Sequence, residues 1–321
     1  NTLEMLGTAR SIQPGLFGAN TEAMLKDVTQ VLIIACGTSY HAGMVARYWI
    51  EAMAGVPCNV EVASEYRYRE TVPDPKTLVV TLSQSGETAD TLAALEHAKS
   101  LGMTKTLCIC NVPESSLVRA NALRFITRAG PEIGVASTKA FTTQLASLYL
   151  LTLIIAKLHG RLTEAMEAKE LSALRHLPAA VSDVLELEPQ IREWAERFAM
   201  KPDALFLGRG RHYPIAMEGA LKLKEIAYTF TEGFAAGELK HGPIALVDEG
   251  EPVVFIVPPA RGRNVLHAKV ISGIEEVKAR GAYIIAVAEE NDPDVERYAD
   301  VVFWRPACPT LMSPLVDVVP L

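Results

Sequence analysis

The sequence predicts an α/β protein built from two doubly wound domains with parallel sheets, related by an internal repeat. Two observations predict this fold. Short apolar runs rich in β-branched residues alternate with stretches of helical length and spacing, and the whole alternation occurs twice. Apolar runs of this kind are typical of strands buried on both faces of a parallel sheet, and the stretches between them supply the covering helices.

The first alternation lies within residues 21–160, which we interpret as the first domain, after a lead segment at 1–20. The longest apolar stretch, 145–158, is shorter than the ~20 apolar residues that a membrane-spanning helix needs, so we expect a buried helix there. In chain order, the expected strands and helices of this domain cover residues 31–35, 41–54, 77–82, 88–101, 106–110 and 139–158.

A charged segment rich in alanine and leucine, residues 161–197, is interpreted as a helical linker. The second domain then covers 198–321. The repeat is clearest where each domain opens, because I-I-A-C-G-T-S and L-F-L-G-R-G both lead from a strand through glycine into a helix, about 170 residues apart. Divergence between the halves indicates one ligand site rather than two. Strands of the second domain are expected at 204–207, 253–257, 283–287 and 301–304.

Composition excludes several classes of protein. The 321 residues are 49% hydrophobic and 21% charged, as in a compact enzyme, and the formal net charge is −7. This charge gives no field that would draw the chain onto nucleic acid or an anionic membrane, so an anionic ligand would need a local positive pocket. The chain opens without a secretory signal, and we expect a cytoplasmic protein.

The cysteines and histidines predict no disulfide framework and no metal site. Five cysteines are odd in number and mostly in apolar context, which suits buried thiols. We expect Cys108 and Cys110 to point to opposite faces of one strand, which would separate their thiols. The seven histidines lack the spacing of a zinc site, and we expect no metal and no cofactor.

The strongest local signal is L-S-Q-S-G-E-T at residues 82–88, where a buried strand ends in Ser83, Gln84 and Ser85 and a helix begins at Thr88. A helix N-terminus offers free N–H groups and a positive dipole end, and neutral hydroxyls add donors. This composition suits a sugar phosphate that must leave again. The alternative is a turn whose hydroxyls only cap the helix.

Two further hydroxyl-bearing turns could serve the same ligand. Ser39 follows the strand at 31–35, and Ser137 lies in G-V-A-S-T-K-A-F before the helix at 139–158. Ser39 is expected at the carboxyl edge of the first sheet, where such folds bind ligands, and the segment entering the helix could direct Ser137 at the same ligand. Most turns of this composition in proteins only cap a helix.

The acid–base candidate is E-G-A-L-K-L-K-E at 218–225, where Glu218, Lys222 and Glu225 share one helical face. Glu225 could move a proton between adjacent sugar carbons, with Lys222 keeping it ionised or stabilising charge on the substrate. The alternative is a solvated ladder of salt bridges.

His241, between glycines in G-E-L-K-H-G-P, could protonate a ring oxygen and open a cyclic sugar, because histidine titrates near neutrality. A loop histidine with a structural hydrogen bond is the alternative.

Taken together, five motifs resemble the isomerase portion of glutamine–fructose-6-phosphate aminotransferases, a family with sugar isomerase (SIS) domains. The resemblance runs from about residue 20 to the end of the chain. The motifs are C-G-T-S-Y, L-S-Q-S-G-E-T-A-D-T, E-I-G-V-A-S-T-K-A-F-T-T-Q, E-G-A-L-K-L-K-E and G-E-L-K-H-G-P, in this order.

The resemblance implies flavodoxin-like topology, a homodimer with a shared active site, and conversion of fructose 6-phosphate and glutamine-derived ammonia into glucosamine 6-phosphate. It also implies which residues act. Glu225 would move the C1/C2 proton with Lys222 beside it, and His241 would open the ring from the other subunit. Phosphate would be held by Ser83, Gln84, Ser85 and Thr88, and the sugar by Ser39, Val135 and Ser137.

Two departures from the family pattern concern the termini. The family has an N-terminal glutaminase domain with a nucleophilic cysteine as first residue, whereas this sequence opens with Asn1, so we do not expect it to hydrolyse glutamine. The family also carries a C-terminal lysine that forms a Schiff base with the ketose, beyond the position of Leu321. A sugar-phosphate-sensing SIS module and another SIS deglycase or isomerase are the alternative functions.

Overall fold

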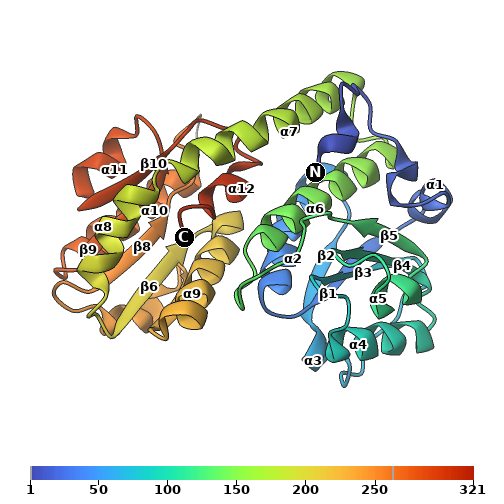
Figure 1. Ribbon diagram of the computed structural model, residues 1–321, viewed down its shortest axis with the longest axis horizontal. Coiled ribbons are helices and arrows are strands. Elements are labelled where there is room, and N and C mark those ends of the chain that lie inside the picture. The colour runs from blue at the N-terminus through green and yellow to red at the C-terminus, as the bar shows by residue number, and fades with distance from the viewer. Residues whose placement is uncertain (1, 262–263) are drawn as a thin grey trace. The chain divides into compact units, whose positions relative to one another are not determined.

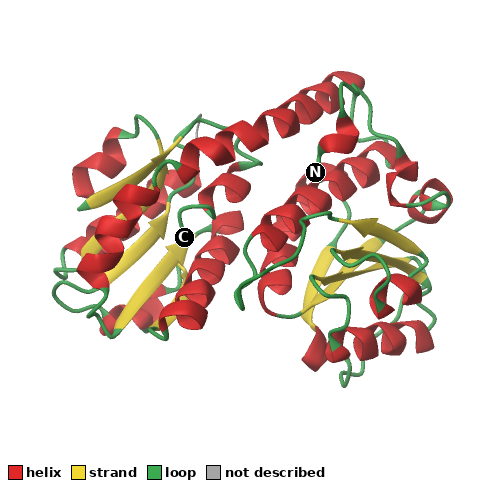
Figure 2. Ribbon diagram, in the orientation of Figure 1, coloured by secondary structure: helices red, strands yellow, loops and turns green. Residues whose placement is uncertain are grey.

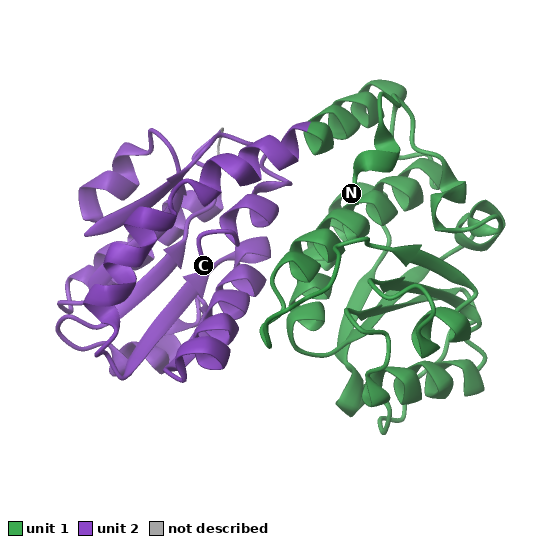
Figure 3. Ribbon diagram, viewed as in Figure 1, with its two compact units in different colours: residues 1–175 green, residues 176–321 purple. Residues whose placement is uncertain are grey.

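The computed structural model describes residues 2–261 and 264–321, and the chain divides into two compact units, residues 1–175 and 176–321 (Figure 3). Each unit contains one sheet with helices packed against it (Figure 2). The strands in each sheet are parallel throughout, so all the strands of a sheet end at the same edge.

The sheet of unit 1 has five strands in the order β2-β1-β3-β4-β5 (Figure 1). The three predicted strands are confirmed to within one residue at each end, as β1, β3 and β4. The two edge strands, β2 and β5, were not predicted. The bounds are β1 (Gln30–Ala35), β2 (Cys58–Val62), β3 (Thr77–Ser83), β4 (Lys105–Cys110) and β5 (Leu123–Ile126).

Helices cover both faces of this sheet. On one face α2 packs against β1 and β2, and α6 packs against α2. On the other face α3, α4 and α5 enclose a buried cluster with β1, β3 and β4. The helices of unit 1 are η1 (Glu4–Leu6), η2 (Pro14–Phe17), α1 (Thr21–Leu25), α2 (Gly37–Trp49), η3 (Ile50–Ala54), α3 (Ala63–Tyr66), α4 (Ala89–Ser100), α5 (Ser116–Ala120) and α6 (Lys139–Leu158).

Helix α6 is the one helix among the described residues that is long and apolar enough to cross a membrane by length and composition. Most of it, 78% of the apolar window, is buried inside the protein. It begins and ends at the residues that the sequence predicted, and its burial is that of a core helix.

The expected separation of Cys108 and Cys110 is wrong. Both side chains are buried in the cluster that β4 forms with α4 and α5. The reason is the period of a strand: successive residues alternate between faces, so residues two apart share a face. All five cysteines are free thiols, and all except Cys36 are buried.

The sheet of unit 2 has the order β10-β9-β8-β6-β7. Matching β6 with β1, β7 with β2 and β8 with β3 gives the same strand order in both units, the 2-1-3-4-5 order of flavodoxin-like folds. This identity confirms the predicted internal repeat. The bounds are β6 (Asp203–Gly208), β7 (Phe230–Ala235), β8 (Pro252–Ile256), β9 (Tyr283–Glu289) and β10 (Val301–Arg305).

In unit 2, α10 and α11 enclose a buried cluster with β6, β8 and β9, and α9 packs on β6 and β7. The division between the units falls within α7, which contains Pro178. The remaining helices are α7 (Glu164–Leu185), α8 (Glu188–Phe198), η4 (Gly210–His212), α9 (Tyr213–Ala227), η5 (Leu239–His241), η6 (Pro243–Leu246), α10 (Val265–Lys278), α11 (Pro293–Tyr298) and α12 (Ser313–Asp317).

Candidate functional site

A cavity of about 180 Å³ lies in unit 1 beside the carboxyl ends of β1 and β3. Its walls come from the start of α2, the loop between β3 and α4 with the first turn of α4, and the segment before α6. Six of the predicted ligand-binding residues therefore line one cavity, although they are up to 98 positions apart in the chain. The lining residues are Cys36, Thr38, Ser39, Leu82, Ser83, Gln84, Ser85, Thr88, Thr91 and Ser137.

The loop from Ser83 to Thr88 is held by its own hydroxyl groups. The N–H of Gly86 donates to Ser83 Oγ at 2.9 Å, and Thr88 Oγ1 lies 3.2 Å from the same oxygen. The N–H of Glu87 donates to Ser85 Oγ at 3.2 Å. These local bonds fold the loop into a compact turn at the end of β3, so its shape is set without a ligand.

Gly86 allows this turn to pack closely against the rest of the unit. Its φ is 71°, and a Cβ at this position would lie 2.0 Å from Ser115 Oγ and 2.8 Å from Cys110 Sγ. A side chain is therefore excluded both by the backbone conformation and by its neighbours.

The positive end of α4 faces this loop. Thr88 is the N-cap residue in an extended conformation, and its side chain makes no capping hydrogen bond. The first backbone bond of the helix runs from Leu92 N–H to Thr88 O at 3.0 Å. The N–H groups that Ser83 and Ser85 accept belong to Gly86 and Glu87, which precede the helix, and the Thr88 hydroxyl makes no cap bond. Helix capping therefore does not account for these hydroxyls.

The acidic residue in this loop is directed elsewhere. Glu87 Oε1 accepts the N–H of Ser116 at 2.8 Å, at the beginning of α5. This hydrogen bond from the Ser116 backbone lowers the pKa of the Glu87 carboxyl. Because this carboxylate is bound to the start of α5, the electrostatic potential of the cavity is set by its neutral hydroxyls and by the dipole of α4.

Ser39 and Ser137 complete the cavity from two other elements. Ser39 is buried in the first turn of α2, and Ser137 precedes α6, whose first N–H groups are held by Glu132. Val135 is not among the lining residues, and its side chain is 99% exposed. Its contact with a sugar stays a prediction.

In unit 2, the acid–base candidates form a close group on α9. Lys222 Nζ lies 2.6 Å from Glu225 Oε2 and 3.3 Å from Glu218 Oε1. Glu218 and Lys222 are buried, with exposed fractions of 1% and 8%, whereas a third of the Glu225 side chain is exposed. The alternative of a solvated ladder does not fit this burial. One accessible carboxylate is instead supported by a buried lysine–glutamate pair.

His241 ends the short helix η5 in unit 2 and is exposed to solvent. Its backbone N–H donates to Glu238 O at 2.9 Å, and Gly242 follows with a φ of 141°. An exposed imidazole on a glycine-flanked turn can reach a ligand or another chain. Its role, and the convergence of Lys222 and Glu225 with the cavity of unit 1 on one ligand, remain predictions.

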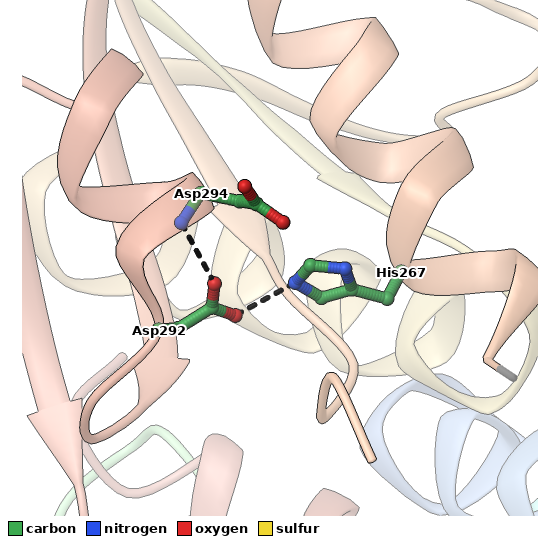
Figure 4. A group of neighbouring side chains, drawn as sticks. All are labelled: His267, Asp292 and Asp294. Carbon is green, nitrogen blue, oxygen red and sulfur yellow. Dashed lines mark hydrogen bonds and ion pairs between the residues drawn. The ribbon is translucent and has the colours of Figure 1, made fainter. Parts of the chain in front are cut away.

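A second group of titratable residues in unit 2 has a structural explanation. Figure 4 shows Asp292 between the ring of His267 and the N-terminus of α11. Asp292 Oδ2 lies 2.7 Å from His267 Nε2, and Oδ1 accepts the N–H groups of Asp294 and Val295. Both oxygens of this buried carboxylate thus have protein partners, which makes it a helix cap joined to α10.

A larger cavity in unit 2, of about 360 Å³, differs in chemistry from the cavity of unit 1. It lies between α8, α9 and the sheet, and most of its walls are apolar, with Trp194, Phe198 and Phe206 among them. Its composition does not suit a dianionic phosphate.

The fold and the first cavity define a class of protein. It has two α/β units, each with a parallel sheet, and a hydroxyl-lined cavity at the carboxyl edge of one of the two sheets. The model of the SIS domain matches residues 24–154 and 198–320, and the chain belongs to the SIS domain family. The two matched segments correspond to the two sheets, one in each unit.

Particular relatives narrow this class. The chain is 56% identical over 318 residues to a glutamine–fructose-6-phosphate aminotransferase (isomerizing) of Bordetella parapertussis, covering 99% of this chain and 52% of the relative. It is 54% identical over 321 residues to the enzyme of that name from Xanthomonas campestris pv. campestris, covering 100% of this chain and 52% of the relative. The chain spans about half the length of these curated relatives.

A solved structure agrees with these relatives. The C-terminal domain of glucosamine–fructose-6-phosphate aminotransferase from Francisella tularensis superposes with a TM-score of 0.94 at 45% identity. The match covers 100% of this chain and 89% of that chain.

Proposed function

We propose that the chain is the isomerase part of a glutamine–fructose-6-phosphate aminotransferase, which converts fructose 6-phosphate and ammonia into glucosamine 6-phosphate. The observation that carries the proposal is the hydroxyl-lined cavity at the N-terminus of α4. It occurs in a chain more than half identical to relatives that are named for this reaction.

The cavity supports binding of the phosphate. Ser83, Gln84, Ser85 and Thr88 supply neutral donors around a helix N-terminus, and such an arrangement binds an anion without a fixed cationic partner. Ser39 and Ser137 would then hold the sugar hydroxyls. The binding stays reversible because each contact is a hydrogen bond rather than an ion pair.

The group on α9 supports the proton transfer. Ammonia and the C2 ketone give an imine with loss of water. The Glu225 carboxylate then removes a proton from C1 and returns one to C2, which leaves a 2-amino aldose. Lys222 Nζ, 2.6 Å from Glu225 Oε2, holds this carboxylate in position by an ion pair. His241 would first open the sugar ring by protonating its ring oxygen.

The proposal has two requirements for partners. The residues on α9 and the cavity of unit 1 must meet on one ligand, with His241 supplied by a second copy in a homodimer. The ammonia must come from a glutaminase domain of the same gene product. A cytoplasmic location and the absence of nucleic-acid or membrane partners belong to the same proposal.

Calorimetry with fructose 6-phosphate and with unphosphorylated fructose tests the binding step. We expect the 321-residue chain to bind only the phosphorylated sugar, and Ser83→Ala to weaken binding about tenfold, since hydrogen bonds to charged groups are worth about 1.5–3 kcal/mol. Ser147→Ala, at a buried serine bonded to Thr143 O in α6, is the matched control and should bind as the wild type.

The outcomes separate the proposal from its alternatives. Equal binding of both sugars, or binding of neither, would contradict the proposed site. Tight binding of fructose 6-phosphate by the gene product that carries this sequence, without any isomerised or aminated product, would favour a sensing module.

A further inference from the structure

Thr91 lies in the wall of the unit 1 cavity without a partner for its hydroxyl group. It is the third residue of α4, 1% exposed, and its Oγ1 makes no hydrogen bond. Three positions separate it from Thr88, so the two threonines share one side of the helix. Of these two, Thr88 already contacts Ser83 Oγ at 3.2 Å.

An unpaired buried hydroxyl is unfavourable, because it loses its hydrogen bonds to water and gains none inside the protein, at a cost in free energy. Valine has nearly the same shape and would fill this position without that cost. In a helix, threonine commonly satisfies its hydroxyl by donating to the carbonyl of the preceding turn, and Thr152 does so with Leu148 O at 2.9 Å. Thr91 Oγ1 makes no such hydrogen bond.

We propose that the Thr91 hydroxyl is a further ligand-binding group, which donates a hydrogen bond to the bound phosphoryl group directly or through one ordered water. Rotation about χ1 exchanges the hydroxyl with the methyl group, and threonine in helices populates two such rotamers. A ligand in the cavity can therefore draw the hydroxyl toward it without a change in the backbone. This inference rests on the proposed function, because it assumes that the cavity binds a phosphate monoester.

The test compares three substitutions by calorimetry with fructose 6-phosphate and, separately, with inorganic phosphate. Thr91→Val removes the hydroxyl and keeps the shape. We expect it to weaken binding of both probes about tenfold, while the melting temperature stays the same or rises. Thr91→Ser keeps the hydroxyl and should bind within about threefold of the wild type. Thr152→Val, at a buried helical threonine outside the cavity lining, should leave both affinities unchanged.

Each outcome decides the inference. Wild-type affinity in Thr91→Val, alongside weakened binding in Ser83→Ala, would overturn the role of Thr91 and leave the proposed function intact. A loss of affinity for fructose 6-phosphate alone, with inorganic phosphate unaffected, would overturn the assignment to the phosphoryl group. If the wild type binds neither probe, the proposed function fails and this inference fails with it.

Discussion

At the scale of single residues, the cavity of unit 1 depends on small neutral side chains held in one compact turn. Ser83 and Ser85 each accept a backbone N–H from within the loop, and these two bonds do not use the O–H groups as donors. Gly86 provides the close packing that holds the turn against Ser115. The loop is thus preorganised, and ligand binding does not carry the entropy cost of ordering it.

Gly86→Ala should destabilise the protein more than Gly102→Ala. Both glycines have positive φ, 71° and 88°, so both variants carry the conformational penalty of about 1–2 kcal/mol. At Gly102 a Cβ meets nothing within 4 Å, whereas at Gly86 it overlaps Ser115 and Cys110. Steric overlap adds about 1–3 kcal/mol in a well-packed region. Urea unfolding of both variants measures the difference, and equal losses of stability would contradict this account of the loop.

The sequence predicted most residues of this cavity, because each follows the carboxyl end of a buried strand or precedes a helix. Thr91 carried no separate signal, since it reads as an ordinary residue of the first helical turn. Only the structure reveals that its hydroxyl lacks a partner. The exposure of Val135 likewise depends on the path of a loop, which residue pattern alone does not specify.

At the scale of elements, the burial of a strand largely determines whether it can be predicted from the sequence. The central strands β1, β3 and β8 are almost wholly buried, and most of their residues are apolar. The strands that escaped prediction, β2, β5 and β7, lie at sheet edges. Each is partly exposed and carries polar residues such as Glu61, Arg124 and Glu232, so no apolar run marks it.

Lys222→Met should destabilise unit 2 strongly, whereas Lys224→Met on the same helix should not. Lys222 compensates the charge of the buried Glu218, and removing one member of a buried pair costs about 3 kcal/mol or more. Lys224 is exposed, which makes it the matched control. Thermal or urea unfolding compares the two variants. A small effect at Lys222 would mean that the pair is solvated after all.

Glu251, just before β8, is expected to make the stability of unit 2 depend on pH. Burial and the neighbouring Asp203 raise the pKa of the Glu251 carboxyl from 4.5 to about 7. A raised pKa in the folded state contributes stability that is fully present below about 4.5 and is lost as the pH rises through about 7.

Glu251→Gln should therefore melt higher than the wild type at pH 8, with a difference that shrinks toward pH 5. Glutamine stays neutral and can donate toward Asp203 at every pH. Melting curves between pH 5 and 8 measure this trend, with Glu249→Gln at an exposed neighbouring position as control. A difference that does not vary with pH would rule out the coupling between Glu251 and Asp203.

At the scale of the whole molecule, one fold is used twice with different results. In unit 1 the loop after β1 presents Ser39 to a cavity. In unit 2 the corresponding loop after β6 presents His212, which is buried and lies 2.8 Å from Ser313 Oγ and 3.2 Å from Asp317 Oδ2. The His212 side chain after β6 is thus bound by other side chains of unit 2. This difference agrees with the expectation of one ligand site for two similar domains.

The central claim is that a hexose phosphate held in unit 1 has its C1/C2 proton moved by Glu225. The most direct measurement is incorporation of deuterium at these carbons when the gene product that carries this sequence is incubated with fructose 6-phosphate in D₂O. NMR should detect exchange with the wild type. With Glu225→Gln, exchange should slow by a factor of about 10²–10⁴ while calorimetry still finds binding. Exchange at the wild-type rate in Glu225→Gln would contradict the claim.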